Sequence, residues 1–210
     1  MDNLRSIWDG TKTYFPLLKE KVKGKSLDIC IVGASDGRFV IPLALNGHKV
    51  LAIENDPMSL DGCFIEINGS TKQYLGIVEK VKNLNLEKSV TISESSFMDF
   101  QTNNKFDVVF TSSSWDCGKN DGTVVEDFVK KMQNLVKQDG ILCAEYMMKF
   151  EEIHLNNPNL LEVGEINKFF NNDWEILDEF YTSVFNDIPH IKKLTIHKHK
   201  MGFIMLKKLT

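Results

Sequence analysis

The sequence predicts an α/β protein with a doubly wound, mostly parallel sheet. Two observations lead to this fold class. Short apolar runs rich in β-branched residues alternate with helical patterns through the first two thirds of the chain. Two strand-like runs, 174–185 and 192–209, then follow one another with no helix between them. Such a pair predicts an antiparallel hairpin added to the parallel strands.

The first elements are expected to alternate regularly. The run 26–33 is continuously apolar, as in a strand buried on both faces. A helix is expected over 38–47 and the next strand over 48–55. Asp56 and Pro57 then begin a second helix, because Asp favours the N-cap and Pro the first helical position.

The middle of the chain continues the alternation. A long helical region is expected from about Asp61 to Leu86, with a break at 67–71. An amphipathic pattern over 122–140 predicts a helix closed by Gly140. Further strands are expected at 89–95, 106–113 and 141–148.

Composition limits the class of protein. The 210 residues suit one domain, 1–210, in which residues 1–24 form an N-terminal helical segment. The net charge of −4 disfavours a protein that grips long nucleic acid. No run has the apolar core of a signal peptide or the length of a membrane span. The four cysteines form no CxxC pair, which favours reduced core residues in a cytoplasmic protein.

The sequence predicts no metal centre. A zinc site would need clustered Cys and His ligands, and the chain shows no such cluster. His197 and His199 alternate along the last strand-like run, so they share one face. That face is expected to be solvated, with a metal pair as the less favoured alternative.

The loop "IVGASDGR", residues 31–38, has three interpretations. A phosphate-binding P-loop would need a lysine that the loop lacks. A dinucleotide loop would need glycines where Ser35 and Arg38 stand. The third interpretation is a loop for a nucleoside cofactor without phosphates, which needs small residues because the ligand lies against the backbone.

Glu54 supports a nucleoside ligand. It stands 17 positions after Gly37, at the expected end of the second strand. A carboxylate there can accept hydrogen bonds from both ribose hydroxyls. NAD and S-adenosylmethionine both carry a ribose, so Glu54 alone does not choose between them. The predicted terminal hairpin favours S-adenosylmethionine, on the family resemblance described next.

Residues 36–60 and 197–208 are similar to class I S-adenosylmethionine-dependent methyltransferases, in particular the tellurite-resistance and thiopurine type. The resemblance implies a Rossmann-like seven-stranded mixed sheet whose last strand is antiparallel, and S-adenosyl-L-methionine as the cofactor. The chain departs from the family pattern at three places. Ser35 replaces the middle glycine of the loop, Ile31 replaces an acid before it, and Ser96 replaces the acid that meets the adenine.

The resemblance and the position of strand ends together predict the cofactor site. The loop residues would lie against the methionine part and the ribose, with a ligand-free strand-to-helix turn as the alternative. Backbone carbonyls after the fourth strand would meet the ammonium group, because ligands of such sheets bind at the carboxyl ends of strands. Core packing is as good an interpretation of Phe97, and turn formation nearly as good for Asn55. The predicted cofactor-binding residues are Gly33, Ala34, Ser35, Gly37, Glu54, Asn55, Ser96, Phe97, Thr111 and Ser112.

Substrate-contacting and catalytic groups are expected around the same rim. The predicted substrate-binding residues are Trp8, Tyr14, Trp115, Glu145 and His154, and the predicted catalytic residues are Asp116, Tyr146 and His190. An aromatic face such as that of Trp115 attracts a sulfonium cation, but a core tryptophan is the alternative. Asp116 can equally cap the following segment, and His190 can be a solvated loop histidine.

The expected activity is methyl transfer to an N, O or S nucleophile of a small molecule or short peptide. A sulfonium already carries a good leaving group, so the missing catalytic triad does not argue against catalysis. A nucleic-acid or protein methyltransferase is an alternative. It is disfavoured because "SSSWD" stands where amino-methylating nucleic-acid enzymes carry a di-proline tetrapeptide. A non-catalytic subunit on this fold is the other alternative. Membrane partners are not expected, and the sequence does not define the oligomeric state.

Overall fold

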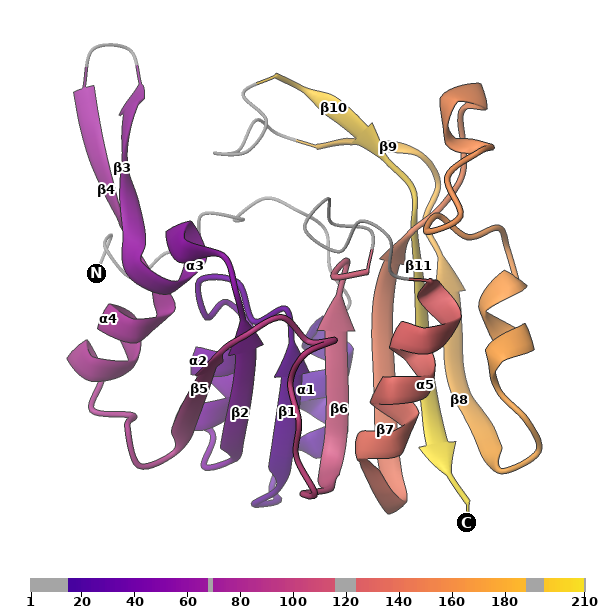
Figure 1. Cartoon of the computed structure of the whole chain (residues 1–210), viewed down its shortest axis with the longest axis horizontal. Helices are drawn as coiled ribbons and strands as arrows, with labels where there is room; N and C mark the ends of the chain where they lie inside the picture. Colours follow the sequence, from indigo (N-terminus) through magenta and orange to yellow (C-terminus); the bar gives the residue numbers. More distant parts are fainter. Residues whose placement is uncertain (1–14, 68–69, 116–123, 188–194, 210) are drawn as a thin grey trace. The chain divides into compact units, whose positions relative to one another are not determined.

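The computed structural model describes residues 15–67, 70–115, 124–187 and 195–209. Within these ranges, seven strands form one sheet in the order β5-β2-β1-β6-β7-β11-β8 (Figure 1). β1, β2 and β5 pair in parallel, and so do β6 and β7, whereas β11 pairs antiparallel with both β7 and β8. The predicted mixed sheet with a reversed last strand is therefore confirmed. The strands are β1 (Asp28–Val32), β2 (Lys49–Glu54), β5 (Val90–Glu94), β6 (Phe106–Ser112), β7 (Val136–Met147), β8 (Trp174–Tyr181) and β11 (Met201–Lys208).

The chain divides into two compact units, each of which is described by itself. The first comprises 1–101 and 187–197, and the second comprises 102–186 and 198–210. In the first unit, α2 (Val40–Leu45) packs against β2, and α1 (Phe15–Val22) places Phe15 edge-on to Phe39, with ring centroids 5.0 Å apart. The register of β1 on β2 sets Val32 opposite Ile53, so both strands end at the same rim.

The predicted helix from Asp61 to Leu86 is wrong over most of its length. The structure has α3 (Pro57–Asp61), an antiparallel hairpin of β3 (Gly62–Ile67) and β4 (Ser70–Leu75), and then α4 (Ile77–Asn83). β-branched and aromatic residues favour strands, and in the sequence the dipeptide Asn68-Gly69, the strongest short hairpin signal, stands between the two runs. The interpretation as a long helix gave this signal too little weight.

Close backbone packing at the base of this hairpin requires glycine. A Cβ on Gly76 would lie 2.1 Å from the Leu60 carbonyl oxygen, and one on Gly62 would lie 2.2 Å from the Tyr74 carbonyl oxygen. The hairpin is therefore joined to α3 and α4 where two backbone segments lie in close contact. Its strand β3 carries Phe64, which is 72% exposed.

In the second unit, α5 (Val125–Leu135) lies over β6 and β7 (Figure 1) and buries one apolar face that includes Phe128 and Met132. The predicted helix through Gly140 is wrong in its last turn, because β7 begins at Val136, well before the predicted strand at 141. Val136 pairs with Phe106, and the register then shifts, with Asp139 at a φ of 60°. Two 3-10 helices, η3 (Glu152–His154) and η4 (Glu165–Phe169), follow β7.

The two C-terminal strand-like runs are each interrupted. β8 ends at Tyr181 and is followed by the short strand β9 (Phe185–Asp187), while β10 (His197–His199) precedes β11. β9 and β10 form a separate two-stranded sheet. Just after β8, Thr182 is bound to the first residue of β11. The Thr182 N–H donates to the Met201 carbonyl at 2.9 Å, and the Met201 N–H donates to Thr182 Oγ1 at 2.8 Å.

Two further sequence expectations concern cysteines and membranes. Cys30 and Cys143 are buried free thiols, Cys63 is a half-buried one, and burial raises the pKa of Cys30 to about 12. Cys117 lies outside the described residues. Across the described ranges, no helix combines the length and the apolar character that crossing a bilayer requires.

Acid is expected to weaken the first unit through His48. This side chain is 1% exposed, neither ring nitrogen has a hydrogen-bond partner within the described structure, and desolvation lowers its pKa. The folded state therefore binds this proton less readily than the unfolded state, whose histidine titrates near about 6.5. Stability is fully present above that pH and is lost as the pH falls below it. Thermal melts between pH 8 and pH 5 should show a smaller fall in Tm for His48→Gln than for the wild type. Equal falls would contradict this assignment.

Candidate functional site

The loop of residues 33–37 follows β1 and is fastened to the end of β2. The N–H groups of Gly33 and Ala34 both donate to the Ile53 carbonyl at 3.0 Å, and the Gly37 N–H donates to the Ala34 carbonyl at 3.1 Å. These bonds bring the loop to the rim where β1 and β2 end. The sequence predicted this position for the loop, because the chain must turn sharply between the apolar strand and the helix that follows.

Three residues of this loop have left-handed backbone conformations. Gly33 and Gly37 have φ values of 68° and 89°, and Ser35, between them, has a φ of 50°. Ser35 therefore adopts a conformation that glycine adopts without strain, at the position where the methyltransferases that the sequence resembles carry the middle glycine of the loop. Its hydroxyl is buried and has no hydrogen-bond partner among the described residues. The substitution preserves the shape of the turn and adds one unsatisfied polar group to it.

Glu54 ends β2 and holds three backbone N–H groups. Its Oε2 accepts from Ser35 at 2.7 Å, and its Oε1 accepts from Asn55 and Asp56 at 2.9 Å each. The side chain is only 9% exposed. One carboxylate thus ties the loop after β1 to the turn after β2. The sequence predicted only a ligand-binding role for Glu54 and not this structural one.

A buried ion pair lies beneath the loop and was missed by sequence reasoning. Lys80 Nζ of α4 donates to Asp36 Oδ2 at 2.8 Å and to the Asp36 carbonyl at 2.9 Å. The two side chains are 2% and 1% exposed. A signal was available, because Lys80 stands three residues after Ile77 and next to Val81, on the apolar face of its helix.

The other predicted cofactor residues of this unit differ in how free they are to bind. Ser96 Oγ donates to Asp99 Oδ2 at 2.8 Å and accepts from the Asp99 N–H at 3.1 Å, so its hydroxyl already forms a local turn. Phe97 is 5% exposed, consistent with the core-packing alternative, while Asn55 is exposed next to Glu54.

In the second unit, polar side chains gather where β6 and β7 end. Ser112 Oγ donates to Glu145 Oε2 at 2.8 Å, and the Ser113 N–H donates to the Glu145 carbonyl at 2.9 Å. Thr111 Oγ1 donates to Ser114 Oγ at 2.8 Å. Glu145 and Thr111 are fully buried. The structure thus brings together the predicted residues Thr111, Ser112 and Glu145 within one unit.

Trp115 and Tyr146 form an aromatic stack in this unit. Their ring centroids are 5.7 Å apart, and Trp115 also meets Phe128 edge-on at 5.8 Å. Both members of the stack have no exposed surface. Burial, followed by the neighbouring Tyr181 and Glu179, raises the pKa of Tyr146, so the phenol stays protonated at neutral pH. Tyr146 therefore lacks the character of a base in this structure.

Of the remaining predicted residues, the structure describes His154 but not the other four. His154, in η3, is half-buried with its ring edge-on to Phe150, at a centroid distance of 4.5 Å. The other four, Trp8, Tyr14, Asp116 and His190, lie outside the described residues.

By sequence, neither a protein-family model nor a curated protein matches the chain. By structure, it is similar to TehB from Haemophilus influenzae, with a TM-score of 0.69 and 14% identity; the match covers 95% of this chain but 63% of TehB. The chain has the class I methyltransferase fold. A second similar structure is coclaurine N-methyltransferase bound to N-methylheliamine and S-adenosylhomocysteine, with a TM-score of 0.64, 11% identity and coverage of 99% of this chain and 78% of the other.

The methyltransferase fold does not by itself fix the reaction. The [4+2]-cyclase SpnF is also similar, with a TM-score of 0.65, 12% identity and coverage of 95% of this chain and 85% of the other. Function must therefore be argued from the residues of the site. In this fold class, ligands bind outside the carboxyl ends of the strands, where the loop, Glu54 and the Ser112–Glu145 pair all lie in their own units.

Proposed function

We propose that this chain is a methyltransferase that binds S-adenosylmethionine at the loop of residues 33–37 and Glu54. The acceptor is a nucleophilic atom of a small molecule or short peptide. The observation that carries the proposal is the conformation of the loop, which has three left-handed residues fastened to a buried carboxylate at the end of β2. A non-glycine residue in the left-handed region, as Ser35 is, occurs preferentially at active and ligand-binding sites.

The polar groups at this rim fit a nucleoside. A carboxylate offers about four acceptor sites, and backbone N–H groups fill three of those on Glu54, so one remains for a ribose hydroxyl. The buried Ser35 hydroxyl adds a group that a polar ligand atom would satisfy. The small side chain of Ala34 keeps the backbone accessible to the ligand.

The rest of the cofactor site is assigned on the family resemblance. Asn55 would reach the face of the adenine, Ser96 would contact the adenine through its hydroxyl, and Phe97 would contact it through its backbone N–H. In the second unit, the carbonyls of Thr111 and Ser112 would accept hydrogen bonds from the ammonium group. Glu145 would fix the orientation of Ser112, whose hydroxyl donates to its carboxyl group.

Bound S-adenosylmethionine would supply a methyl group on a positively charged sulfur. The chain's own contribution is to orient the acceptor in line with that methyl group and to exclude water. Trp115 and Tyr146 form a fully buried aromatic stack, so they would hold the neighbouring backbone in place rather than contact the acceptor. Burial keeps the Tyr146 phenol protonated, so it is not proposed as a base. Asp116 and His190 stay as proposed proton acceptors for substrates that must lose a proton.

A small-molecule acceptor is favoured over nucleic acid. The net charge is −4, and the segment after β6 lacks the tetrapeptide of amino-methylating nucleic-acid enzymes. Trp8, Tyr14 and His154 are proposed to contact the substrate, on the family resemblance.

The binding proposal is tested by calorimetry with S-adenosylhomocysteine on the wild type, Glu54→Ala and Glu79→Ala. Removing Glu54 is expected to weaken binding by about 10- to 100-fold, because a hydrogen bond to a charged group contributes about 1.5–3 kcal/mol. Glu79 is the matched control, since it is an exposed glutamate on α4 in the same unit, and its variant should bind as the wild type does.

Circular dichroism must show that the Glu54→Ala variant is folded, because this side chain also ties down the loop. Wild-type protein that binds no S-adenosylhomocysteine at millimolar concentration would overturn the proposal and leave the non-catalytic subunit as the better interpretation. Binding that is unaffected by Glu54→Ala would place the cofactor elsewhere.

A further inference from the structure

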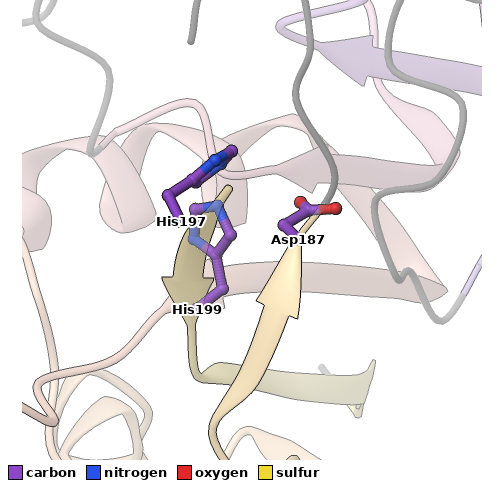
Figure 2. Close-up of side chains that lie close together, drawn as sticks. All are labelled: Asp187, His197 and His199. Atoms are coloured by element: carbon purple, nitrogen blue, oxygen red, sulfur yellow. The ribbon is translucent and has the colours of Figure 1, made fainter. Parts of the chain in front are cut away.

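We propose that the β9–β10 hairpin binds a divalent first-row transition metal, with Zn²⁺ as the preferred ion, through Asp187, His197 and His199. Figure 2 shows Asp187 on one strand and both histidines on its neighbour, with the three side chains gathered together. One donor atom from each residue lies within 4.8 Å of those of the other two. This inference is independent of the proposed methyltransferase activity.

The spacing of the donors suits a metal after a small closure. Zinc binds imidazole nitrogen and carboxylate oxygen at about 2.0–2.2 Å in tetrahedral geometry, which places neighbouring donors roughly 3.3–3.6 Å apart. The separations here are within 4.8 Å. Side-chain rotations within the hairpin can close a difference of this size, so no change in strand pairing is required.

A backbone contact prepares His197 as a ligand. Its Nδ1 lies 3.0 Å from the Thr195 carbonyl oxygen. A carbonyl only accepts, so Nδ1 carries the proton and Nε2 carries the lone pair in the neutral ring. Metal-bound histidines almost always donate their other ring N–H in this way, which fixes both the tautomer and the ring orientation.

The burial of these groups is unusual for so small an element. Asp187 is 2% exposed and His197 is 8% exposed, although β9 and β10 contain three residues each. The ring of Phe185 lies next to His199, at a centroid distance of 6.1 Å. The expectation of a solvated face is therefore wrong for His197. A carboxylate beside two imidazoles is a donor set that suits a cation.

The donor set selects the class of metal. Two imidazoles and one carboxylate match sites for zinc and for non-haem iron, whereas Mg²⁺ and Ca²⁺ prefer sites made wholly of oxygen. Three protein ligands leave a further position open for water or another ligand. A short two-stranded hairpin is marginal on its own in water, and a metal that joins β9 to β10 would staple it.

Calorimetric titration of untagged full-length protein with ZnCl₂, in excess Mg²⁺, tests the site. We expect one saturable site with a Kd below about 10 μM. Asp187→Asn, His197→Ala and His199→Ala should each weaken binding by at least about tenfold. Lys198→Ala is the matched control, because Lys198 lies between the histidines and its exposed side chain points to the opposite face. Its affinity should stay within twofold of the wild type.

Two further measurements separate zinc from its competitors. Anaerobic titration with Fe²⁺ shows which ion binds more tightly, and tighter binding of Mg²⁺ than of either would overturn the proposal. The visible spectrum of Co²⁺-loaded protein should show the strong bands of low coordination number, and the His197→Ala variant should lack them. Absent saturable Zn²⁺ binding, or ligand variants that bind like Lys198→Ala, would also overturn it. Circular dichroism of each variant excludes loss of folding as the cause.

Discussion

Replacing Lys80 with methionine is expected to lower the free energy of unfolding by about 3–5 kcal/mol, because it leaves the Asp36 carboxylate buried without its cation. Lys80 donates to both the carboxylate and the carbonyl of Asp36, with each side chain about 98% or more buried. Methionine retains the length of the apolar stem but cannot donate. Urea denaturation of the wild type and the variant measures the difference.

Two companion variants identify the cause. Lys82→Met removes an exposed lysine two residues after Lys80 on α4. It should change the free energy of unfolding by less than about 0.5 kcal/mol. The double variant Asp36→Asn, Lys80→Met carries no buried charge, and should recover much of the lost stability. A Lys80→Met protein as stable as Lys82→Met would contradict the assignment of a buried ion pair.

The same substitution should also change the shape of the loop of residues 33–37, the proposed cofactor site. Asp36 stands between Ser35 and Gly37, which are two of the three loop residues with left-handed conformations. Lys80 has no place among the predicted ligand contacts, so any loss of S-adenosylhomocysteine affinity in a folded Lys80→Met protein would act through the shape of the loop. We expect that affinity to fall in Lys80→Met and to be unchanged in Lys82→Met.

Replacing Gly202 with alanine is expected to destabilise the second unit by about 1–3 kcal/mol or more, through overpacking. Gly202 on β11 lies opposite Tyr146 on β7, and an added Cβ would stand 2.4 Å from Tyr146 Cζ and 2.7 Å from its hydroxyl oxygen. The ring cannot yield easily, because it is fully buried and stacked on Trp115. The effect is measured by urea denaturation, with near-ultraviolet circular dichroism reporting the aromatic stack.

A double-mutant cycle provides the control for this prediction. Tyr146→Ala alone removes a buried ring and should itself cost about 3–5 kcal/mol. With that ring gone, Gly202→Ala should cost little or become stabilising, since alanine is favoured over glycine in a strand by about 0.5–1 kcal/mol. Additive effects of the two substitutions would show that the clash with Tyr146 is not the cause.

The parallel core was predictable because burial on both faces leaves a strong mark on sequence. β1 and β2 are continuous apolar runs, and Glu54 follows the second at the rim where ligands bind in such sheets. The reversed final strand was predictable because two strand-like runs with no helix between them have few other solutions.

The errors arose where a local signal competed with a helical pattern. Residues 62–75 carry enough apolar residues to resemble a helix, but they form the β3–β4 hairpin. Similarly, Val136 extends the apolar face of α5, yet it begins β7 by pairing with Phe106. Tertiary pairing decided both cases, and a single sequence gives no direct measure of pairing.

The site shows the same limit at the level of side chains. The position of Glu54 was predictable, but its three backbone donors depend on how two turns meet in space. The burial of His197 also depends on β9, a strand of three residues that is too short to be recognised from the sequence pattern. Residue type and order predict where a group stands along the chain, whereas its partners follow from folding.

The fastening of the loop by Glu54 has a consequence for ligand capture. The turns after β1 and β2 are already joined by Glu54 in the free protein, so they lose their conformational freedom when the chain folds and not when a ligand binds. A ligand arriving at this rim meets a preorganised surface, so little of its contact energy is diverted into ordering the backbone. Affinity at this rim should then depend mainly on how well the ligand fits a backbone that is already ordered.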